Sequence, residues 1–220
     1  MKKISLIALA LITSTAMFAQ MENENRTKMA VKPRFGIKAG ANLSKLRPNA
    51  YPSSTTVETN LKTSFGGGFL VNIPLGTMGL AFQPEVLFNG QGSKMNVKTS
   101  IGGLSTDSKY EQDLRYLSVP LMLQWKSMGG FYAEAGPQLS FLLDARQDGP
   151  GTTNIENEKS FENFEVSAGA GLGYMSRVGL GIGARYNHGF SNVLDNEGSS
   201  ADLKHSVINI GLVYLFGANK

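Results

Sequence analysis

The chain has 220 residues, of which 41% are hydrophobic and 17% charged, and its formal net charge at pH 7 is +4. It contains no cysteine, which excludes disulfides, thiolate metal sites, a cysteine nucleophile and an anchor through an acylated cysteine. It has no block of Lys and Arg of the nucleic-acid-binding kind. No apolar run of about 18 residues follows the N-terminal segment, which excludes a transmembrane helix but not a barrel of transmembrane strands.

Residues 1–19 are predicted to be a cleaved signal peptide. Lys2 and Lys3 precede an apolar stretch and then small residues, which is the order of a secretory signal. Cleavage is expected after Ala19, with cleavage after Ala16 as the alternative. Removing the two lysines leaves 19 basic and 17 acidic side chains, so the exported chain is close to neutral.

A polar, patternless lead over residues 20–33 is expected to be mobile, and a regular pattern begins at Arg34. From Phe35 to Ser44 every odd-numbered residue is apolar, whereas every even-numbered residue is small, polar or charged. This alternation predicts a strand with two different faces. Lys38 among glycines does not suit a dry core, so the second face favours the polar interior of a barrel with an apolar outside.

The same alternation recurs along the chain, separated by turn-forming segments. Strands are predicted at 34–44, 61–73, 79–90, a stretch ending in 117–125, 131–141, 164–174, 180–187 and 208–216. Short turns are predicted at 74–78, 126–130 and 176–179, and long polar loops at 45–60, 91–109, 144–160 and 191–202. Pro84, Pro120 and Pro137 fall inside strands, where we expect bulges or irregular pairing because proline has no N–H to donate.

The connections therefore alternate between long and short. An even-stranded barrel with short periplasmic turns, long external loops and both termini in the periplasm produces this alternation. The predicted fold is all-β: a single domain over residues 34–217 that forms an eight-stranded antiparallel up-and-down transmembrane β-barrel. Side chains fill the interior of a barrel of this size, and closure leaves no strand edge unpaired.

Aromatic residues on the outward face collect at two levels, as interfacial girdles require. The level near the short turns comprises Phe35, Trp125, Phe131, Tyr174 and Phe216. The level near the long loops comprises Phe65, Phe88, Phe141, Phe164 and Tyr186. The alternative is ordinary core packing in a soluble β protein.

Six charged side chains are predicted to point into the lumen: Lys38, Lys62, Glu85, Glu134, Glu165 and Arg185. We interpret them as a structural, self-neutralising network, since charges removed from water must be paired or wetted. The alternative is a polar conduit or a ligand site.

No catalytic residue, metal site or cofactor is predicted. His188 and His205 flank the last long loop near serines, but their parity places them on opposite faces, and no acidic partner at defined spacing accompanies either one. The run 169–173 (GAGLG) has the glycines of a dinucleotide-binding loop, but it lies within strand pattern and lacks the following helix.

Several stretches carry a family resemblance in order along the chain: FGIKAGANLS, FQPEVLFNGQGSK, YLSVPLMLQWK, FYAEAGPQLSFLL, EVSAGAGLGY, RYNHGFSNV and INIGLVYLFG. Together they resemble the PorT-like outer-membrane β-barrel family, over about Arg34 to Gly217. The resemblance implies an integral outer-membrane barrel in contact with lipid but no single activity. The final strand also resembles the signal read by the barrel-assembly machinery, although four residues follow Phe216.

The function expected is a structural or interaction role, with a protein partner bound through the external loops. Three alternatives remain: a narrow solute channel, a secretion-system accessory and a soluble periplasmic barrel that binds an apolar ligand. The last requires the apolar face inside, with Lys38 and Arg185 outside.

Overall fold

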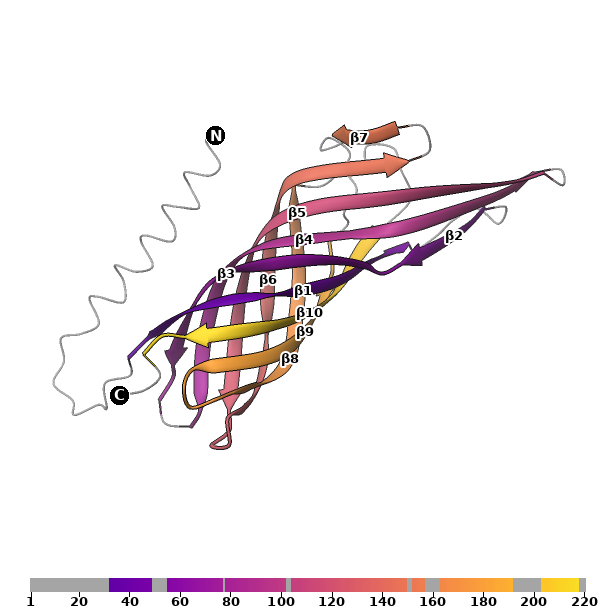
Figure 1. Ribbon diagram of the computed structural model, residues 1–220. Helices are drawn as coiled ribbons and strands as arrows, with labels where there is room; N and C mark the ends of the chain where they lie inside the picture. Colours follow the sequence, from indigo (N-terminus) through magenta and orange to yellow (C-terminus); the bar gives the residue numbers. More distant parts are fainter. Residues whose placement is uncertain are drawn as a thin grey trace. The chain divides into compact units, whose positions relative to one another are not determined.

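A computed structural model describes residues 32–48, 55–76, 78–101, 104–149, 152–156, 163–191 and 203–217. The predicted signal peptide and residues 20–31 of the lead lie outside these ranges. The strands are β1 (Arg34–Pro48), β2 (Thr55–Asn60), β3 (Lys62–Pro74), β4 (Leu80–Ile101), β5 (Leu104–Lys126), β6 (Phe131–Gly149), β7 (Thr152–Glu156), β8 (Phe164–Met175), β9 (Leu180–Gly189) and β10 (Leu203–Leu215) (Figure 1). No helix among the described residues is long and apolar enough to cross a bilayer.

Eight of these strands close into a ring. In order around the wall they are β1, β3, β4, β5, β6, β8, β9 and β10, and each neighbouring pair is antiparallel. The first and last strands complete the ring, with pairs from Gly36–Leu215 to Pro48–Leu203. The predicted eight-stranded antiparallel up-and-down barrel is therefore confirmed. The two remaining strands are short, and each pairs with one strand of the wall: β2 with β4, and β7 with β6.

The three short turns end in the same way, and they define the short-turn end of the barrel. Each finishes on a glycine with a positive φ, which a residue with a Cβ rarely adopts. The carbonyl of that glycine accepts a hydrogen bond from the backbone N–H of the strand beside it. These bonds are Lys126 to Gly79 (2.8 Å), Met175 to Gly130 (2.8 Å) and Leu215 to Gly179 (2.9 Å).

The other end of the barrel, called here the hairpin end, corrects three of the predicted loops. Residues 91–109 are almost entirely strand, because β4 and β5 stay paired as far as Ile101 and Leu104. Likewise β2 occupies part of 45–60, and β6 and β7 fill much of 144–160. Figure 1 shows the β4–β5 hairpin as the longest projection from the wall. These segments were predicted to be loops because their composition is polar. Strands beyond the apolar zone need no apolar face, however, and are stabilised by cross-strand pairing. Residues 192–202 of the fourth loop lie outside the described residues.

Proline interrupts the wall where the sequence predicts irregularity. The β4–β5 pairs run to Pro84 and resume at Leu87, and the β5–β6 pairs run to Pro120 and resume at Leu123. Pro137 lies in the same interruption, because the β6 partners of β5 pass from Gln138 to Ala135, although on its other side Pro137 pairs with Ala168 in an unbroken β6–β8 ladder. Irregular pairing is thus confirmed beside all three prolines.

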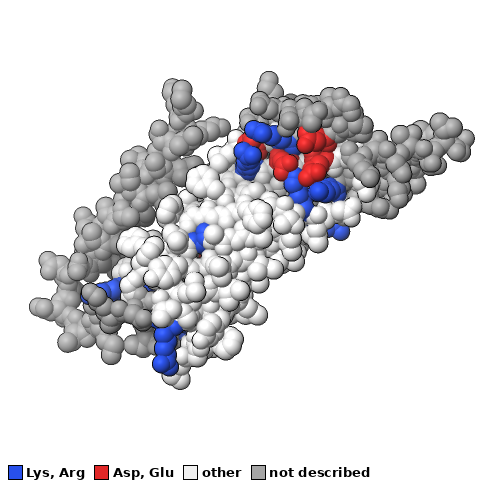
Figure 2. Space-filling model, in the orientation of Figure 1, with Lys and Arg blue, Asp and Glu red and all other residues white. Residues whose placement is uncertain are grey.

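The outer face of the wall is apolar. Both predicted aromatic levels point outward, and nine of their ten members are strongly exposed, including Phe65 at 77% and Phe131 at 67%. Figure 2 shows charged residues gathered toward the two ends of the visible face, with a largely uncharged band between them. Exposed apolar area on this scale requires a lipid surface or a partner. The soluble alternative needs the opposite arrangement and is wrong, since Arg185 is only 3% exposed.

Candidate functional site: the filled lumen

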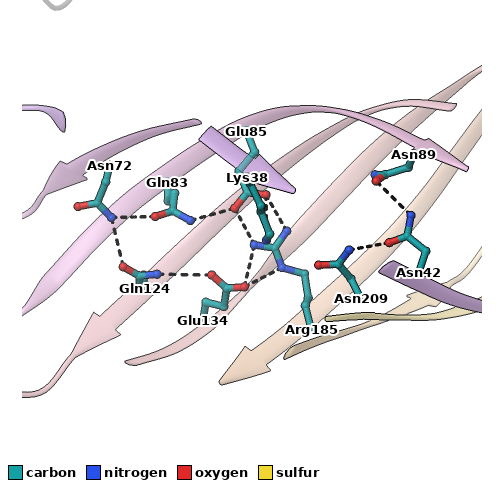
Figure 3. Close-up of polar contacts among 10 residues, drawn as sticks. All are labelled: Lys38, Asn42, Asn72, Gln83, Glu85, Asn89, Gln124, Glu134, Arg185 and Asn209. Carbon is teal, nitrogen blue, oxygen red and sulfur yellow. Dashed lines mark hydrogen bonds and ion pairs between the residues drawn. The ribbon is translucent and has the colours of Figure 1, made fainter. Parts of the chain in front are cut away.

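Four of the six predicted lumen charges meet in one group, called here the charged cluster: Lys38, Glu85, Glu134 and Arg185. The guanidinium of Arg185 donates to both carboxylate oxygens of Glu85, at 2.7 and 2.9 Å, and its Nε donates to Glu134 at 2.7 Å (Figure 3). Lys38 Nζ lies 3.5 Å from Glu85. Two cations face two carboxylates, so the charged cluster is neutral as a whole, and its members come from β1, β4, β6 and β9.

Three buried amides extend the charged cluster toward the short-turn end. Gln83 donates to Glu85 at 2.9 Å, and Gln124 approaches Glu134 at 3.5 Å. Asn72 donates to both glutamine oxygens, at 2.9 and 3.2 Å, and so joins the two arms (Figure 3). A buried polar network rigidifies a fold when its members are satisfied, and this one ties β3, β4, β5 and β6 across the lumen.

An apolar plug lies beside the charged cluster on its short-turn side. It consists of Leu70, Tyr132, Met175, Val213 and Leu215, all at most 6% exposed. Cross-strand pairing joins the two layers, because Leu70 lies opposite Glu85 and Val213 lies opposite Lys38.

Inward glycines make room for the plug. A Cβ placed on Gly173 or Gly183 would lie about 2.3 Å from the phenol of Tyr132, a distance that real Cβ atoms do not show. The glycines that the sequence places on the inner face of β8 and β9 therefore accommodate a ring that crosses from β6. Residues 169–173 lie within β8, as the strand pattern predicts.

The two remaining predicted charges do not join the charged cluster. Lys62 lies toward the hairpin end, where it forms ion pairs with Asp113 and with Glu111 (3.2 Å). Glu165 lies 2.8 Å from Nδ1 of the buried His205. The sequence shows no acidic partner of His205 at a defined spacing, and the strand register supplies one from 40 residues away.

The structure does not bring the Glu165–His205 pair together with Ser206. His205 is 1% exposed and packs edge-on against Tyr116 with ring centroids 5.9 Å apart. Ser206 instead contacts the hydroxyl of the exposed Tyr186 at 3.1 Å, which places it on the outer face. His188 lies on that outer side too, 3.3 Å from the same hydroxyl, so the predicted parity of the two histidines is confirmed. No group of three metal-ligating side chains occurs in the part of the chain that the structure describes.

Asparagines form a third layer between the charged cluster and the hairpin end. Asn209 donates to Asn42 at 2.6 Å, and Asn42 donates to Asn89 at 3.3 Å (Figure 3). A small cavity beside them is lined by Gln91 and Asn187, whose side-chain oxygens are buried and accept no hydrogen bond from the described residues. The cavity has room for about one water, which would supply those donors.

Three solved structures are similar to the chain. Ail, the attachment invasion locus protein of Yersinia pestis, is 16% identical, with 84% of this chain and 99% of that chain covered and a TM-score of 0.46. OprG from Pseudomonas aeruginosa is 16% identical, with 83% and 95% covered and a TM-score of 0.42. Neisserial surface protein A is 12% identical, with 82% and 96% covered and a TM-score of 0.44. No curated protein sequence matches the chain.

A family model described as "Outer membrane protein beta-barrel domain" matches residues 18–195, which is most of the chain. This match agrees with the closed ring and the apolar outer face. The chain belongs to the outer membrane protein beta-barrel domain family.

Proposed function

We propose that the protein is a closed scaffold that spans the outer membrane without conducting solutes and acts through the strands at its hairpin end. The observation that carries the proposal is the filled lumen. The apolar plug and the charged cluster occupy adjacent layers, and Glu85, Glu134 and Arg185 are each at most 7% exposed. An eight-stranded barrel has little space beyond what side chains occupy, so these two layers support a non-conducting interior.

Planar-bilayer recording of the purified, folded protein tests this part. Current is expected to stay at baseline across the voltage range, and the same preparation must show the gel-mobility shift on boiling that marks a closed barrel. Reproducible conductance steps from folded protein would favour the narrow channel and contradict the scaffold.

The interaction role rests on the paired strands beyond the barrel. Charges of both signs gather there in partly exposed ion pairs, such as Lys94 with Glu111 at 3.6 Å and Arg146 with Asp144 at 3.2 Å. A paired sheet presents such groups in fixed positions, so binding loses less conformational entropy than binding by a flexible loop. The partner we propose is a protein surface of mixed charge.

Shortening the hairpin tests the interaction role. Ser93 and Gln112 are a cross-strand pair, so residues 94–111 can be replaced by Asn-Gly as a two-residue turn. The shortened variant is expected to fold but to lose the adduct formed on intact cells with a membrane-impermeant cross-linker. Met128→Ala, at an exposed turn tip of the other end, is the matched control and should keep the adduct. An adduct that survives the shortening would contradict the proposal.

The finer assignments are also proposals. A cleaved signal peptide over residues 1–19 and insertion by the barrel-assembly machinery are supported by the sequence pattern, and the intact mass of the outer-membrane protein tests the cleavage after Ala19. The PorT-like resemblance is supported by the order of the motifs. A secretion-accessory role would be excluded if deleting the gene caused no secretion defect.

A further inference from the structure

The short-turn end contains a cavity of about 500 Å³ that neither the scaffold role nor the family match explains. Its floor includes Met175 and Leu215 of the apolar plug, and Leu80 and Trp125 lie in its wall. Two of the three short turns, at residues 74–79 and 126–130, line it. Its volume is within the range of ordinary small-molecule sites, which are mostly apolar with a few polar groups. It borders the lumen layers, because Asn72 and Gln124 of the amide network line it together with Met175 and Leu215.

Two cations line this cavity, and none of the described residues that line it carries a carboxylate. Arg34 begins β1 and Lys126 ends β5, both are half-buried, and Arg34 is close enough to repel the Lys126 ammonium. Neither side chain has a hydrogen bond or ion pair with another described residue, whereas every buried lumen cation described above has an acidic partner. Like charges that are partly withdrawn from water are stabilised by an anion between them.

The wall of the cavity is held in place before any ligand arrives. The turn that begins at Pro74 is fixed to Lys126 through the carbonyl of Gly79, and the next turn is fixed to Met175 through Gly130, both at 2.8 Å. Beside them the N–H of Phe216 donates to Phe35 at 2.8 Å. A preformed site loses less entropy on binding than one that must close around its ligand.

We propose that this cavity binds a small anionic amphiphile, a carboxylate with an apolar chain. The head lies between Arg34 and Lys126 and the chain lies on Met175 and Leu215. Because two turns at the end of the barrel line the cavity, we expect a free amphiphile to reach it from that end, rather than a bilayer lipid from the side. The proposal is independent of the hairpin role.

Titration of decanoate against the folded protein in nanodiscs of zwitterionic lipid tests the site, with empty nanodiscs as the blank. Trp125 is the sole tryptophan of the chain and lines the cavity, but it also faces lipid, so only the part of its fluorescence change that the double variant below loses is assigned to the site. Saturable binding of decanoate is expected, at least tenfold tighter than binding of decanol, which has the same chain without the charge. Equal binding of the two would overturn the proposal.

Substitutions locate the head group. The double variant Arg34→Gln with Lys126→Gln should bind decanoate at least tenfold more weakly, because it removes two charge-assisted contacts. Lys126→Arg keeps the charge and should bind like the wild type. Arg177→Gln removes a cation from another turn at the same end and should also leave binding unchanged. An equal loss in Arg177→Gln, or none in the double variant, would overturn the site.

A last experiment distinguishes a free amphiphile from a bilayer lipid as the source of the anionic head group. Adding phosphatidylglycerol to the nanodiscs should leave decanoate binding unchanged when the ligand is a free amphiphile. Loss of decanoate binding in those discs would show that the lipid head group occupies the site and would overturn the assignment to a free carboxylate.

Discussion

Removing the guanidinium at the centre of the charged cluster should destabilise the barrel more than removing any surface cation. Arg185 makes three charge-assisted hydrogen bonds to two carboxylates. In Arg185→Leu, Glu85 keeps its ion pair with Lys38, whereas Glu134 loses its only ion pair among the described residues and stays buried. Breaking a buried ion pair by removing one partner costs about 3–5 kcal/mol, and we expect a loss of that size.

The matched control is Arg146→Leu at the hairpin end. The side chain of Arg146 is 43% exposed and pairs with Asp144 at 3.2 Å. Exposed pairs of this kind contribute about 0–1 kcal/mol. Folded fractions are measured in lipid vesicles over a urea series, from the gel mobility of unboiled samples. If Arg185→Leu were no less stable than Arg146→Leu, the charged cluster would not stabilise the barrel.

A double variant tests the charge balance of the charged cluster. Once Arg185 is gone, Lys38 and Glu85 still neutralise one another, so Glu134 is the stranded charge. Adding Glu134→Gln to Arg185→Leu should therefore recover part of the lost stability, because neighbouring substitutions in one network are not additive. Further destabilisation by Glu134→Gln would refute this account of the charges.

Three further predictions follow from the packing and are measured by the same urea series. Gly173→Ala should destabilise the barrel by about 1–3 kcal/mol, because its methyl group clashes with the Tyr132 ring. Tyr132→Leu should relieve that clash in the double variant. If the stability losses of the two single variants simply added in the double variant, the two residues would not be in contact. Gly130→Ala should destabilise because its φ is 92° and its Cβ would lie 2.5 Å from the Met175 carbonyl, whereas Gly129→Ala, with no atom closer than 3.9 Å, should have little effect. Leu212→Arg places a charge on the lipid-facing wall, where it should cost about 2–4 kcal/mol near mid-height, and a neutral result would count against that orientation.

The sequence predicted the wall of the barrel better than its two ends. Alternation settles which side chains point inward, so Lys38, Glu85 and Arg185 could be placed in the lumen from parity alone. Parity does not tell how far along the barrel axis a side chain lies. Strand tilt and register set that position, and so decide which inward residues meet. For that reason the sequence could not separate Lys62 from the charged cluster or pair Glu165 with His205.

The hairpin end shows a different limit of prediction. Beyond the apolar zone both faces of a strand meet water, so the period-2 signal disappears while the backbone pairing continues. Residues 91–109 look like a loop for this reason. The cavity at the short-turn end was missed because its two cations, Arg34 and Lys126, lie at strand ends where neither alternation nor a motif marks them.

The register of the charged cluster has a consequence for how the barrel is made. Glu85 and Arg185 are 100 residues apart, and the bond from Asn209 to Asn42 spans 167. Contacts this distant in sequence form slowly, because long stretches of chain must be ordered before they are made. The carboxylates of β4 and β6 gain their guanidinium only when β9 arrives, and the wall gains its last ladder only with β10. A chain that stalls before β9 would keep an open sheet edge and uncompensated acids, which makes it a substrate for proteolysis and aggregation until synthesis and export are complete.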